Sequence, residues 1–357
     1  MIDRMNILFT CSARKWGGNE AWVLNAAQAL DQQQHRVSLA YRADEVGNRF
    51  TVDKYRLPFM NEADLYTLGK LVSIIRQNRI DVVVPTKRKD YFLAGIACRI
   101  TGAKNILILG IVRSLENTLV NNLVYNMLAD GIMVNARVIK EVLLQSGFMK
   151  PDKIAVIPNG ISIDRGDIVP AKKAFDFMVT SLAELSERKG FDFLIRGFAR
   201  FLNEHDLTDA GLVIMGSGGE REKLEALAES LGIAHFVTFA GFVKDPYPNL
   251  LASDLFALTS KNEGIPYAII EAALLDNAII TTRAGGTEEL LEDEEHCLYV
   301  NFGDEALLAN QFHRLHGDKS LRLRLSCNAK KRTAERFSSE KMEKEMIGFF
   351  RKIRSGN

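Results

Sequence analysis

Short apolar runs alternate with longer amphipathic segments in the first half of the chain. The expected strands are Asn6–Cys11, Val37–Tyr41, Asp81–Pro85, Lys104–Leu109, Gly131–Asn135 and Lys153–Ile157. The expected helices are Asn19–Gln33, Glu62–Asn78, Tyr91–Ile100, Asn117–Ala129 and Arg137–Ser146. Because the strand-length runs are rich in Ile, Val and Leu on both faces and helices separate them, the pattern predicts a parallel sheet covered on both sides.

The same alternation starts again after Pro158-Asn159-Gly160 and a polar stretch that ends near Ala174. The expected strands are Phe175–Leu182, Leu212–Met215, Phe236–Phe239, Leu255–Leu258, Ala278–Thr281 and Cys297–Val300. The expected helices are Phe191–Asn203, Glu220–Leu231, Pro266–Leu275, Glu305–His316, Leu321–Glu335 and Ser339–Ile353. The sequence therefore predicts an α/β fold of two doubly wound, Rossmann-like domains, residues 1–163 and 164–335. We expect residues 336–357 to form a C-terminal helix that returns to the first domain.

Composition agrees with a soluble globular protein, because 47% of the residues are hydrophobic and 25% are charged. No run approaches the roughly 20 apolar residues that a membrane-spanning helix needs. The first strand also begins too near Met1 to leave room for a signal peptide. We therefore expect a cytoplasmic protein. Its four cysteines show no C-x-x-C spacing, which predicts free thiols and no metal site.

Charge is divided unevenly between the two halves. Residues 1–165 contain 22 Lys and Arg against 15 Asp and Glu, whereas the remainder contains 24 against 30. This division suggests that the halves bind different partners, and uneven surface charge without a function is the alternative. We expect no nucleic-acid partner.

Three loops between a predicted strand and a predicted helix have chemistry suited to phosphate. Gly17-Gly18 follows the basic pair Arg14-Lys15, Arg188-Lys189 precedes Gly190, and Gly216-Ser217-Gly218 follows the strand at 212–215. Glycines let backbone N–H groups approach an anion, and Arg and Lys add charged donors. A structural glycine turn or a solvated basic turn is the alternative for each. None is the G-x-G-x-x-G fingerprint, which counts against a dehydrogenase.

A fourth segment, Ser260 to Leu275, is more informative. Pro266 suits the first position of the helix, whose N–H groups could hold phosphate or sugar hydroxyls. Glu271 falls on an otherwise apolar helix, where an unpaired carboxylate is costly to bury. Paired ribose hydroxyls or an ordinary salt bridge would each supply a partner.

Glu263 and Glu271, with seven residues between them, resemble the E-x7-E signature of retaining GT-B glycosyltransferases, most closely the family 4 group. Further segments resemble elements of this family in the correct order along the chain. They are Gly17-Gly18, Val156–Ile161, Arg188-Lys189-Gly190, Gly216-Ser217-Gly218 and Gly285–Glu289. These matches are distributed in order over nearly the whole chain.

The resemblance implies a GT-B fold whose two domains face a central cleft, with the acceptor in the first domain and the sugar nucleotide in the second. It implies that Arg188 and Lys189 hold the donor diphosphate, Glu271 the ribose, and Glu263 with Gly264–Pro266 the sugar. The implied donor-binding residues are Gly17, Gly18, Gly216, Gly218, Gly264, Ile265, Pro266 and Glu271. The implied catalytic residues are Glu263, Arg188, Lys189 and Asp90.

The sequence also departs from the family pattern. Ile265-Pro266 stands where Phe-Gly is frequent, and Arg283 replaces a common acidic residue. The loop after the fourth predicted strand, Pro85–Asp90, lacks the histidine that many members have there. Asp90 is the candidate replacement on the acceptor side, and a helix N-cap is its alternative role. His35 is expected to be structural.

No D-x-D sequence is present, so we expect cations of the chain to stabilise the leaving diphosphate without a metal or other cofactor. The expected reaction moves a hexose from a UDP-, GDP- or ADP-sugar to a glycan or lipid-linked acceptor, with retention, in lipopolysaccharide or other surface polysaccharide assembly. Lys87, Arg88, Lys89 and Arg113 would allow peripheral contact with an anionic membrane. A nucleotide-sugar 2-epimerase and a non-catalytic sugar-nucleotide-binding subunit are the alternatives.

Overall fold

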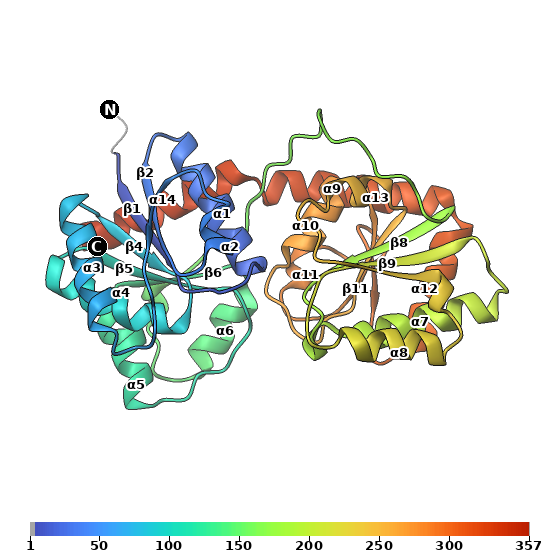
Figure 1. Cartoon of the computed structure of the whole chain (residues 1–357), viewed down its shortest axis with the longest axis horizontal. Coiled ribbons are helices and arrows are strands. Elements are labelled where there is room, and N and C mark those ends of the chain that lie inside the picture. The colour runs from blue at the N-terminus through green and yellow to red at the C-terminus, as the bar shows by residue number, and fades with distance from the viewer. Residues whose placement is uncertain (1–3, 357) are drawn as a thin grey trace. The chain divides into compact units, whose positions relative to one another are not determined.

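The computed structural model describes residues 4–356, which divide between two compact units. The first unit is Met1–Gly160 with Phe337–Asn357, and the second is Ile161–Arg336. Each unit contains one sheet with helices on both of its faces (Figure 1). All strand pairs in the named sheets are parallel, which confirms the predicted pair of doubly wound α/β domains.

The first sheet has seven strands in the order β3-β2-β1-β4-β5-β6-β7. Its strands are β1 (Asn6–Cys11), β2 (Arg36–Tyr41), β3 (Asp53–Arg56), β4 (Val82–Pro85), β5 (Lys104–Leu109), β6 (Gly131–Val134) and β7 (Ile154–Val156). The α-helices of this unit are α1 (Gly18–Gln32), α2 (Asp44–Gly47), α3 (Leu65–Gln77), α4 (Arg88–Thr101), α5 (Leu119–Asn122), α6 (Arg137–Gln145) and α14 (Ser339–Ser355). A π-helix, η1 (Leu123–Leu128), continues α5, and a 3-10 turn, η2 (Pro151–Lys153), precedes β7.

The C-terminal helix α14 belongs to the first unit, and Figure 1 shows it in red among the blue elements. Its buried face includes Met346 and Phe350, both 0% exposed. The side chain of Glu343 on this helix lies 3.7 Å from Nε2 of buried His35, while the His35 Nδ1 accepts a hydrogen bond from the Met5 N–H at 3.1 Å. His35 is therefore structural, as expected from the sequence.

The second sheet has six strands in the order β10-β9-β8-β11-β12-β13. Its strands are β8 (Phe177–Leu182), β9 (Ala210–Met215), β10 (Val237–Gly241), β11 (Leu255–Leu258), β12 (Ala278–Thr282) and β13 (Leu298–Val300). Its α-helices are α7 (Phe191–Glu204), α8 (Arg221–Ser230), α9 (Tyr247–Ala252), α10 (Tyr267–Leu274), α11 (Thr287–Leu290), α12 (Glu305–Gly317) and α13 (Lys319–Arg336). The 3-10 turns are η3 (Glu187–Lys189) and η4 (Ala234–Phe236).

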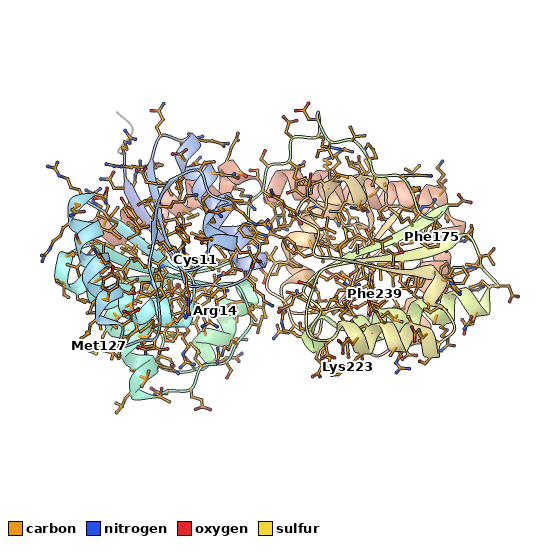
Figure 2. The ribbon with its side chains drawn as sticks, in the orientation of Figure 1. Cys11, Arg14, Met127, Phe175, Lys223 and Phe239 are labelled. Atoms are coloured by element: carbon orange, nitrogen blue, oxygen red, sulfur yellow. The ribbon has the colours of Figure 1, made fainter. Side chains whose placement is uncertain are left out.

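Apolar side chains fill the space between sheet and helices in each unit (Figure 2). In the second unit one continuous core joins α7 and α12 to the sheet through Phe198, Phe201 and Phe312, all 0% exposed. The four cysteines are free thiols, as predicted, and only Cys327 is exposed. No helix among the described residues is both long and apolar enough to cross a bilayer.

The strand orders locate the place where each sheet can bind a ligand. In the first sheet the chain order reverses between β1 and β4, and in the second between β8 and β11. Ligands of doubly wound sheets bind beyond the carboxyl ends of the strands at such a reversal, because the loops there diverge to opposite faces. The loops that follow β8 and β11 are thus the first candidates in the second unit.

Candidate active site

Arg188, Lys189 and Glu263 meet at the reversal of the second sheet. Arg188 and Lys189 lie in η3 after β8, and Glu263 lies in the loop after β11. Nη1 of Arg188 lies 3.4 Å from Oε2 of Glu263, and the Lys189 ammonium donates to Oε1 of the same carboxylate. Glu263 is 6% exposed, so this pairing compensates a charge that would be costly to bury alone.

The two loops are held together by backbone contacts as well. The Lys261 N–H donates to the Arg188 carbonyl at 2.8 Å, and Nη1 of Arg188 donates to the Asn262 carbonyl at 2.8 Å. Gly190 ends η3 with a φ of +64°, and a Cβ at this position would lie 2.2 Å from the Thr259 carbonyl oxygen. A glycine is therefore required where the loop after β8 passes over the end of β11.

This cluster retains unused hydrogen-bond donors. Among the described residues, Arg188 donates only through Nη1, and Lys189 pairs only with the Glu263 carboxylate. A guanidinium carries five N–H donors and an ammonium three, so both side chains can still bind an oxyanion. The cluster can hold and charge-stabilise a phosphate or diphosphate without losing its internal pairing.

Glu271 lies on α10 and has a single hydrogen-bonding neighbour. The Tyr247 hydroxyl donates to Oε1 of Glu271 at 3.5 Å, and no cation pairs with this carboxylate among the described residues. Burial raises the pKa of Glu271 to about 7, against a smaller opposing effect of the Tyr247 hydroxyl. The salt-bridged alternative for Glu271 is therefore wrong, and its carboxylate is an under-used acceptor.

Helix α10 begins one residue later than the sequence suggested. Pro266 is the N-cap, with an extended ψ of 125°, and Tyr267 is the first helical residue. The Pro266 carbonyl accepts from the Ile269 and Ile270 N–H groups, so its missing N–H is still without cost. Gly264, Ile265 and Pro266 are all buried next to Glu263 in the chain.

Close packing between two loops requires glycine at positions 216 and 218. A Cβ at Gly216 would lie 1.8 Å from the Ala183 carbonyl oxygen, and one at Gly218 would lie 2.2 Å from the Leu185 carbonyl oxygen. The Leu185 N–H also donates to the Ser217 carbonyl at 3.0 Å. These glycines let the loop after β9 support the loop after β8, which carries Arg188 and Lys189.

Arg283 has partners outside this cluster. Its guanidinium pairs with Glu288 and Asp293, each at 2.7 Å, and lies 4.6 Å from the centre of the Tyr299 ring. The neighbouring glycine pair still reaches the site, because the Gly286 N–H donates to the Glu263 carbonyl at 3.2 Å. Arg283 thus fixes a surface loop, while Gly286 supports the backbone of Glu263.

In the first unit, Asp90 lies at the corresponding reversal of the sheet. Its Oδ2 accepts from the Ser12 N–H at 3.0 Å, and the side chain is 0% exposed. Burial raises the pKa of Asp90 to about 6. Lys87 is the N-cap of α4, so the N-cap role considered for Asp90 is wrong. Asp90 instead ties the loop after β1, whose Arg14 is marked in Figure 2, to the start of α4.

Gly17 and Gly18 stand at the start of α1 in the first unit, whereas the other predicted donor-binding residues are in the second. Gly17 is the N-cap of α1, and a Cβ there would lie 3.2 Å from Oε2 of Glu20. Glu20 is buried and pairs with Lys87 at 2.7 Å. Sequence reasoning overlooked Glu20, although a glutamate in the first turn of a mostly apolar helix is a signal of the kind that identified Glu271.

One group of side chains among the described residues has the spacing of metal ligands, namely Glu292, Glu295 and His296. Glu292 is already paired with Arg332 at 2.6 Å. These residues lie in the loop between α11 and β13, outside the cluster around Glu263.

Two family models divide the chain between them. Residues 16–165 match the family described as Glycosyltransferase Family 4, and residues 167–332 match the family described as Glycosyl transferases group 1.

Curated proteins of similar sequence are named as glycosyltransferases. A lipopolysaccharide core biosynthesis glycosyltransferase, LpsE, of Rhizobium meliloti (strain 1021) is 32% identical over 218 residues, which are 59% of this chain and 61% of the relative. An N-acetylgalactosamine-N,N'-diacetylbacillosaminyl-diphospho-undecaprenol 4-alpha-N-acetylgalactosaminyltransferase of Campylobacter jejuni is 29% identical over 239 residues, 65% of this chain and 64% of that protein. The chain spans less than two thirds of the length of these curated relatives.

Solved structures match over nearly the whole chain. Anabaena HepE in complex with UDP-glucose has a TM-score of 0.84 and 21% identity, with 97% of this chain and 99% of that chain covered. A glycosyltransferase from Rickettsia africae has a TM-score of 0.83 and 17% identity, with 99% and 100% covered. The chain therefore has the GT-B fold, and its two halves match the Glycosyltransferase Family 4 and Glycosyl transferases group 1 models.

Proposed function

We propose that this protein is a glycosyltransferase that moves a hexose from a nucleotide-sugar donor to a glycan or lipid-linked acceptor, with retention of configuration. The observation that carries the proposal is the cluster of Arg188, Lys189 and Glu263 at the reversal of the second sheet. Departure of a diphosphate from a sugar develops negative charge, and preorganised cations stabilise that charge most where water is scarce.

The remaining parts of the donor have candidate partners in the same unit. The Glu271 carboxylate has a raised pKa and only the Tyr247 hydroxyl beside it, and two ribose hydroxyls would supply the donors that it lacks. Gly264, Ile265 and Pro266, next to Glu263, would contact the sugar. Uridine diphosphate is the favoured nucleotide, because the similar HepE was solved with UDP-glucose.

The acceptor would bind the first unit. Related proteins are named for lipopolysaccharide core biosynthesis and for transfer to a diphospho-undecaprenol acceptor, which favours surface polysaccharide assembly. Asp90 is the proposed acceptor-side carboxylate. Because it is 0% exposed and bonded to the Ser12 N–H, we assign it a positioning role for the loop after β1.

The proposed reaction uses no metal ion, since Arg188 and Lys189 would supply the positive charge. Transfer should therefore continue in excess chelator. Activity that disappears on chelation and returns with manganese or magnesium would contradict this part of the proposal.

The proposal is tested by thermal-shift and product analysis with UDP-, GDP- and ADP-hexoses. We expect a UDP-hexose to raise the melting temperature, and a lipid-linked or glycan acceptor to receive the sugar. A 2-epimerase would change the donor sugar without any acceptor. A non-catalytic binding subunit would show the thermal shift but would form no product.

A further inference from the structure

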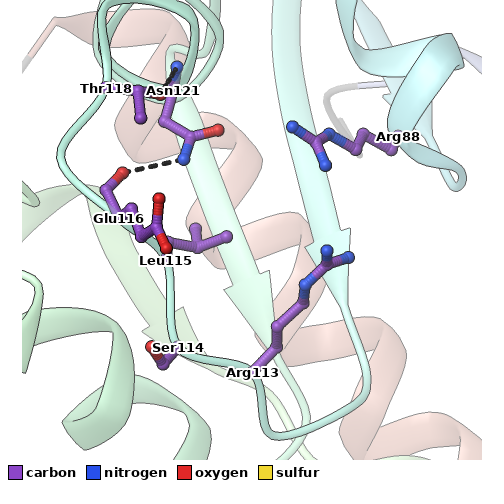
Figure 3. Close-up of a pocket in the computed structure, with 7 residues that line it drawn as sticks. All are labelled: Arg88, Arg113, Ser114, Leu115, Glu116, Thr118 and Asn121. Atoms are coloured by element: carbon purple, nitrogen blue, oxygen red, sulfur yellow. Dashed lines mark hydrogen bonds between the residues drawn. The ribbon is translucent and has the colours of Figure 1, made fainter.

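A pocket of about 290 Å³ opens beyond the carboxyl ends of β4 and β5 in the first unit. It is lined by Arg88, Arg113, Ser114, Leu115, Glu116, Thr118 and Asn121 (Figure 3). Arg88 comes from the start of α4, and the other residues come from the loop after β5 and from α5. None of them belongs to the cluster around Glu263, which lies in the other unit.

The two guanidinium groups of this pocket have no partner. Neither Arg88 nor Arg113 forms an ion pair or hydrogen bond with another described residue, although Glu116 also lines the pocket. In Figure 3 the Arg113 side chain extends toward Arg88, whose guanidinium end points in the direction of Asn121 and Glu116. Two unpaired cations against one carboxylate leave a net positive charge that an anion would neutralise.

The lysines on either side of Arg88 do have partners, so the three basic residues at 87–89 are not equivalent. Lys87 pairs with Glu20 at 2.7 Å, and the Lys89 ammonium donates to the Phe59 carbonyl at 3.0 Å. Within this run, only Arg88 has a side chain without an ion pair or hydrogen bond among the described residues. The sequence predicted that Lys87, Arg88, Lys89 and Arg113 all contact an anionic surface. Of these four, Arg88 and Arg113 are the best candidates for binding an anion.

The mostly buried side chain of Tyr125 lies within electrostatic range of both arginines. Tyr125 is 4% exposed, packs edge-on against Tyr91 with ring centres 6.2 Å apart, and forms no hydrogen bond through its hydroxyl among the described residues. Burial raises its pKa, and the nearby charges of Arg88 and Arg113 act in the opposite direction. Both guanidinium groups therefore lie within electrostatic range of one unused donor.

Exposed apolar side chains adjoin the lining residues. Leu119 is 91% exposed and Val120 is 59% exposed, and both lie on α5 between the lining residues Thr118 and Asn121. Ile111, 48% exposed, precedes Arg113 by two residues. Apolar groups left open beside an unpaired cationic pocket match a ligand that has both an anionic group and a hydrocarbon chain.

We propose that this pocket binds the phosphate of a phosphate-bearing lipid acceptor, with Arg88 and Arg113 on the phosphate and Leu119 and Val120 against the hydrocarbon chain. This inference rests on the proposed function in one respect, namely that the occupant is the acceptor. The phosphate site itself depends only on the pocket, its unpaired charges and the adjoining apolar residues.

The phosphate site is tested by calorimetric titration with inorganic pyrophosphate, with every protein carrying Lys189→Ala so that the diphosphate site proposed in the second unit is weakened. We expect the double variant Arg88→Gln, Arg113→Gln to bind at least about tenfold more weakly, because charge-assisted hydrogen bonds are lost. Glu116→Gln should bind more tightly, since it removes the opposing charge. The control Arg76→Gln, Lys150→Gln removes two exposed cations of the same unit and should bind like the Lys189→Ala parent protein. Equal affinity in all four proteins would overturn the proposal.

The lipid part is tested by flotation with vesicles of phosphatidylglycerol and phosphatidylcholine, against phosphatidylcholine alone. Leu119→Ser, Val120→Ser should reduce association with the anionic vesicles and leave pyrophosphate affinity unchanged. The arginine double variant should lose both. Vesicle association that is unchanged by the serine variant would overturn the lipid assignment, leaving a site for a soluble phosphate.

The same variants separate this inference from the proposed function. UDP-hexose binding, assigned to the second unit, should be equal in the wild type and the arginine double variant. If no nucleotide sugar binds the wild type, the proposed function fails, while the pyrophosphate titration still decides the phosphate site. If the donor binds but the arginine variants transfer sugar to a lipid-linked acceptor at the wild-type rate, the acceptor assignment fails alone.

Discussion

At the scale of single residues, Glu263 links the two cations that would meet the donor diphosphate. Its carboxylate accepts from Lys189 and lies 3.4 Å from Arg188, so the cations are fixed before any ligand arrives. Preorganised charge of this kind spares the reaction the cost of reorienting dipoles. Glu263 thus has a positioning role that can be separated from any contact with the sugar.

Replacing Lys189 by alanine should weaken UDP-hexose binding by about tenfold or more, because a charge-assisted hydrogen bond is worth about 1.5–3 kcal/mol. The variant should also melt at a lower temperature, since Glu263 stays buried with a weaker counter-charge. Calorimetry and a melting curve measure the two effects. Lys223→Ala, which removes an exposed lysine of the same unit, is the matched control. Unchanged donor affinity in Lys189→Ala would remove this lysine from the site.

A second variant separates charge compensation from ligand binding. Adding Glu263→Gln to Lys189→Ala removes the uncompensated carboxylate and should restore much of the melting temperature. Donor binding should stay weak, because the lysine is still missing. Recovery of both properties together would show that Lys189 acts only through Glu263.

Glu271 should make both stability and donor binding depend on pH. Its folded pKa of about 7 lies above the ordinary value of 4.5, so the folded chain holds this proton more tightly than the unfolded chain. The resulting stabilisation is fully present below pH 4.5 and is lost as the pH rises through 7. The melting temperature of Glu271→Gln relative to the wild type should therefore be higher at pH 8 than at pH 5. A difference that does not vary with pH would show that Glu271 is not desolvated.

The same variant should bind UDP-hexose more weakly at pH 8, because an amide replaces an ionised acceptor for the ribose hydroxyls. Tyr247→Phe, which removes the neighbouring hydroxyl and leaves the carboxylate, is the control. Its donor affinity should change less than that of Glu271→Gln. The opposite ranking would assign the contact to Tyr247.

Several site residues could be predicted from the sequence because of where strands end. Arg188 and Glu263 follow strands that become neighbours in a parallel sheet, so their meeting follows from the alternation of strands and helices. Tyr247 could not be found in this way, and Arg113 was predicted only as one of several basic residues for an anionic surface. Each lies in a segment without a motif, and its closeness to Glu271 or Arg88 depends on tertiary packing that no local pattern encodes.

At the scale of elements, most strands and long helices begin and end within about two residues of the predicted bounds, as expected when core residues repeat strongly. β3 was missed because Asp53–Arg56 is a polar edge strand whose residues are mostly exposed. The predicted helix at 117–129 is divided into α5 and the π-helix η1, whose wider turn depends on packing against α4. α2, α9 and α11 were missed because each spans at most six residues, too few for a helical period to show.

The loop after β9 offers a test of the packing role of a glycine. Gly216→Ala should lower the free energy of unfolding by about 2 kcal/mol or more. Gly216 has a φ of +148°, and a Cβ added there would lie 1.8 Å from the Ala183 carbonyl oxygen, so a methyl group does not fit. Gly219→Ala in the same loop is the control, since a Cβ there would meet nothing within 4 Å. Urea unfolding measures both. Equal stability of the two variants would mean that the loop relaxes around the new methyl group.

At the scale of the whole molecule, α14 links the stability of the first unit to the end of the chain. Phe350→Ala should destabilise the first unit by about 3–5 kcal/mol, the usual cost of removing a buried phenylalanine ring. Lys344→Ala, an exposed position on the same helix, should have little effect. Scanning calorimetry with and without UDP-hexose identifies the transition of the second unit as the one that the ligand raises. If Phe350→Ala lowers the melting temperatures of the first-unit and second-unit transitions by the same amount, the two units unfold together.

The return of α14 to the first sheet has a consequence for the order in which the protein matures during translation. The second unit is continuous, so all of its residues have been synthesised once Arg336 is added. The first unit begins earlier but waits for α14, whose Phe349 packs so closely against β6 that a Cβ at Gly131 would lie 2.8 Å from its ring. Domains of nascent chains commonly fold from the N-terminus onwards. Here the ribosome delivers the last helix of the first unit only after the second unit is complete, so the N-terminal half matures last and exposes an uncovered apolar face until α14 packs onto it.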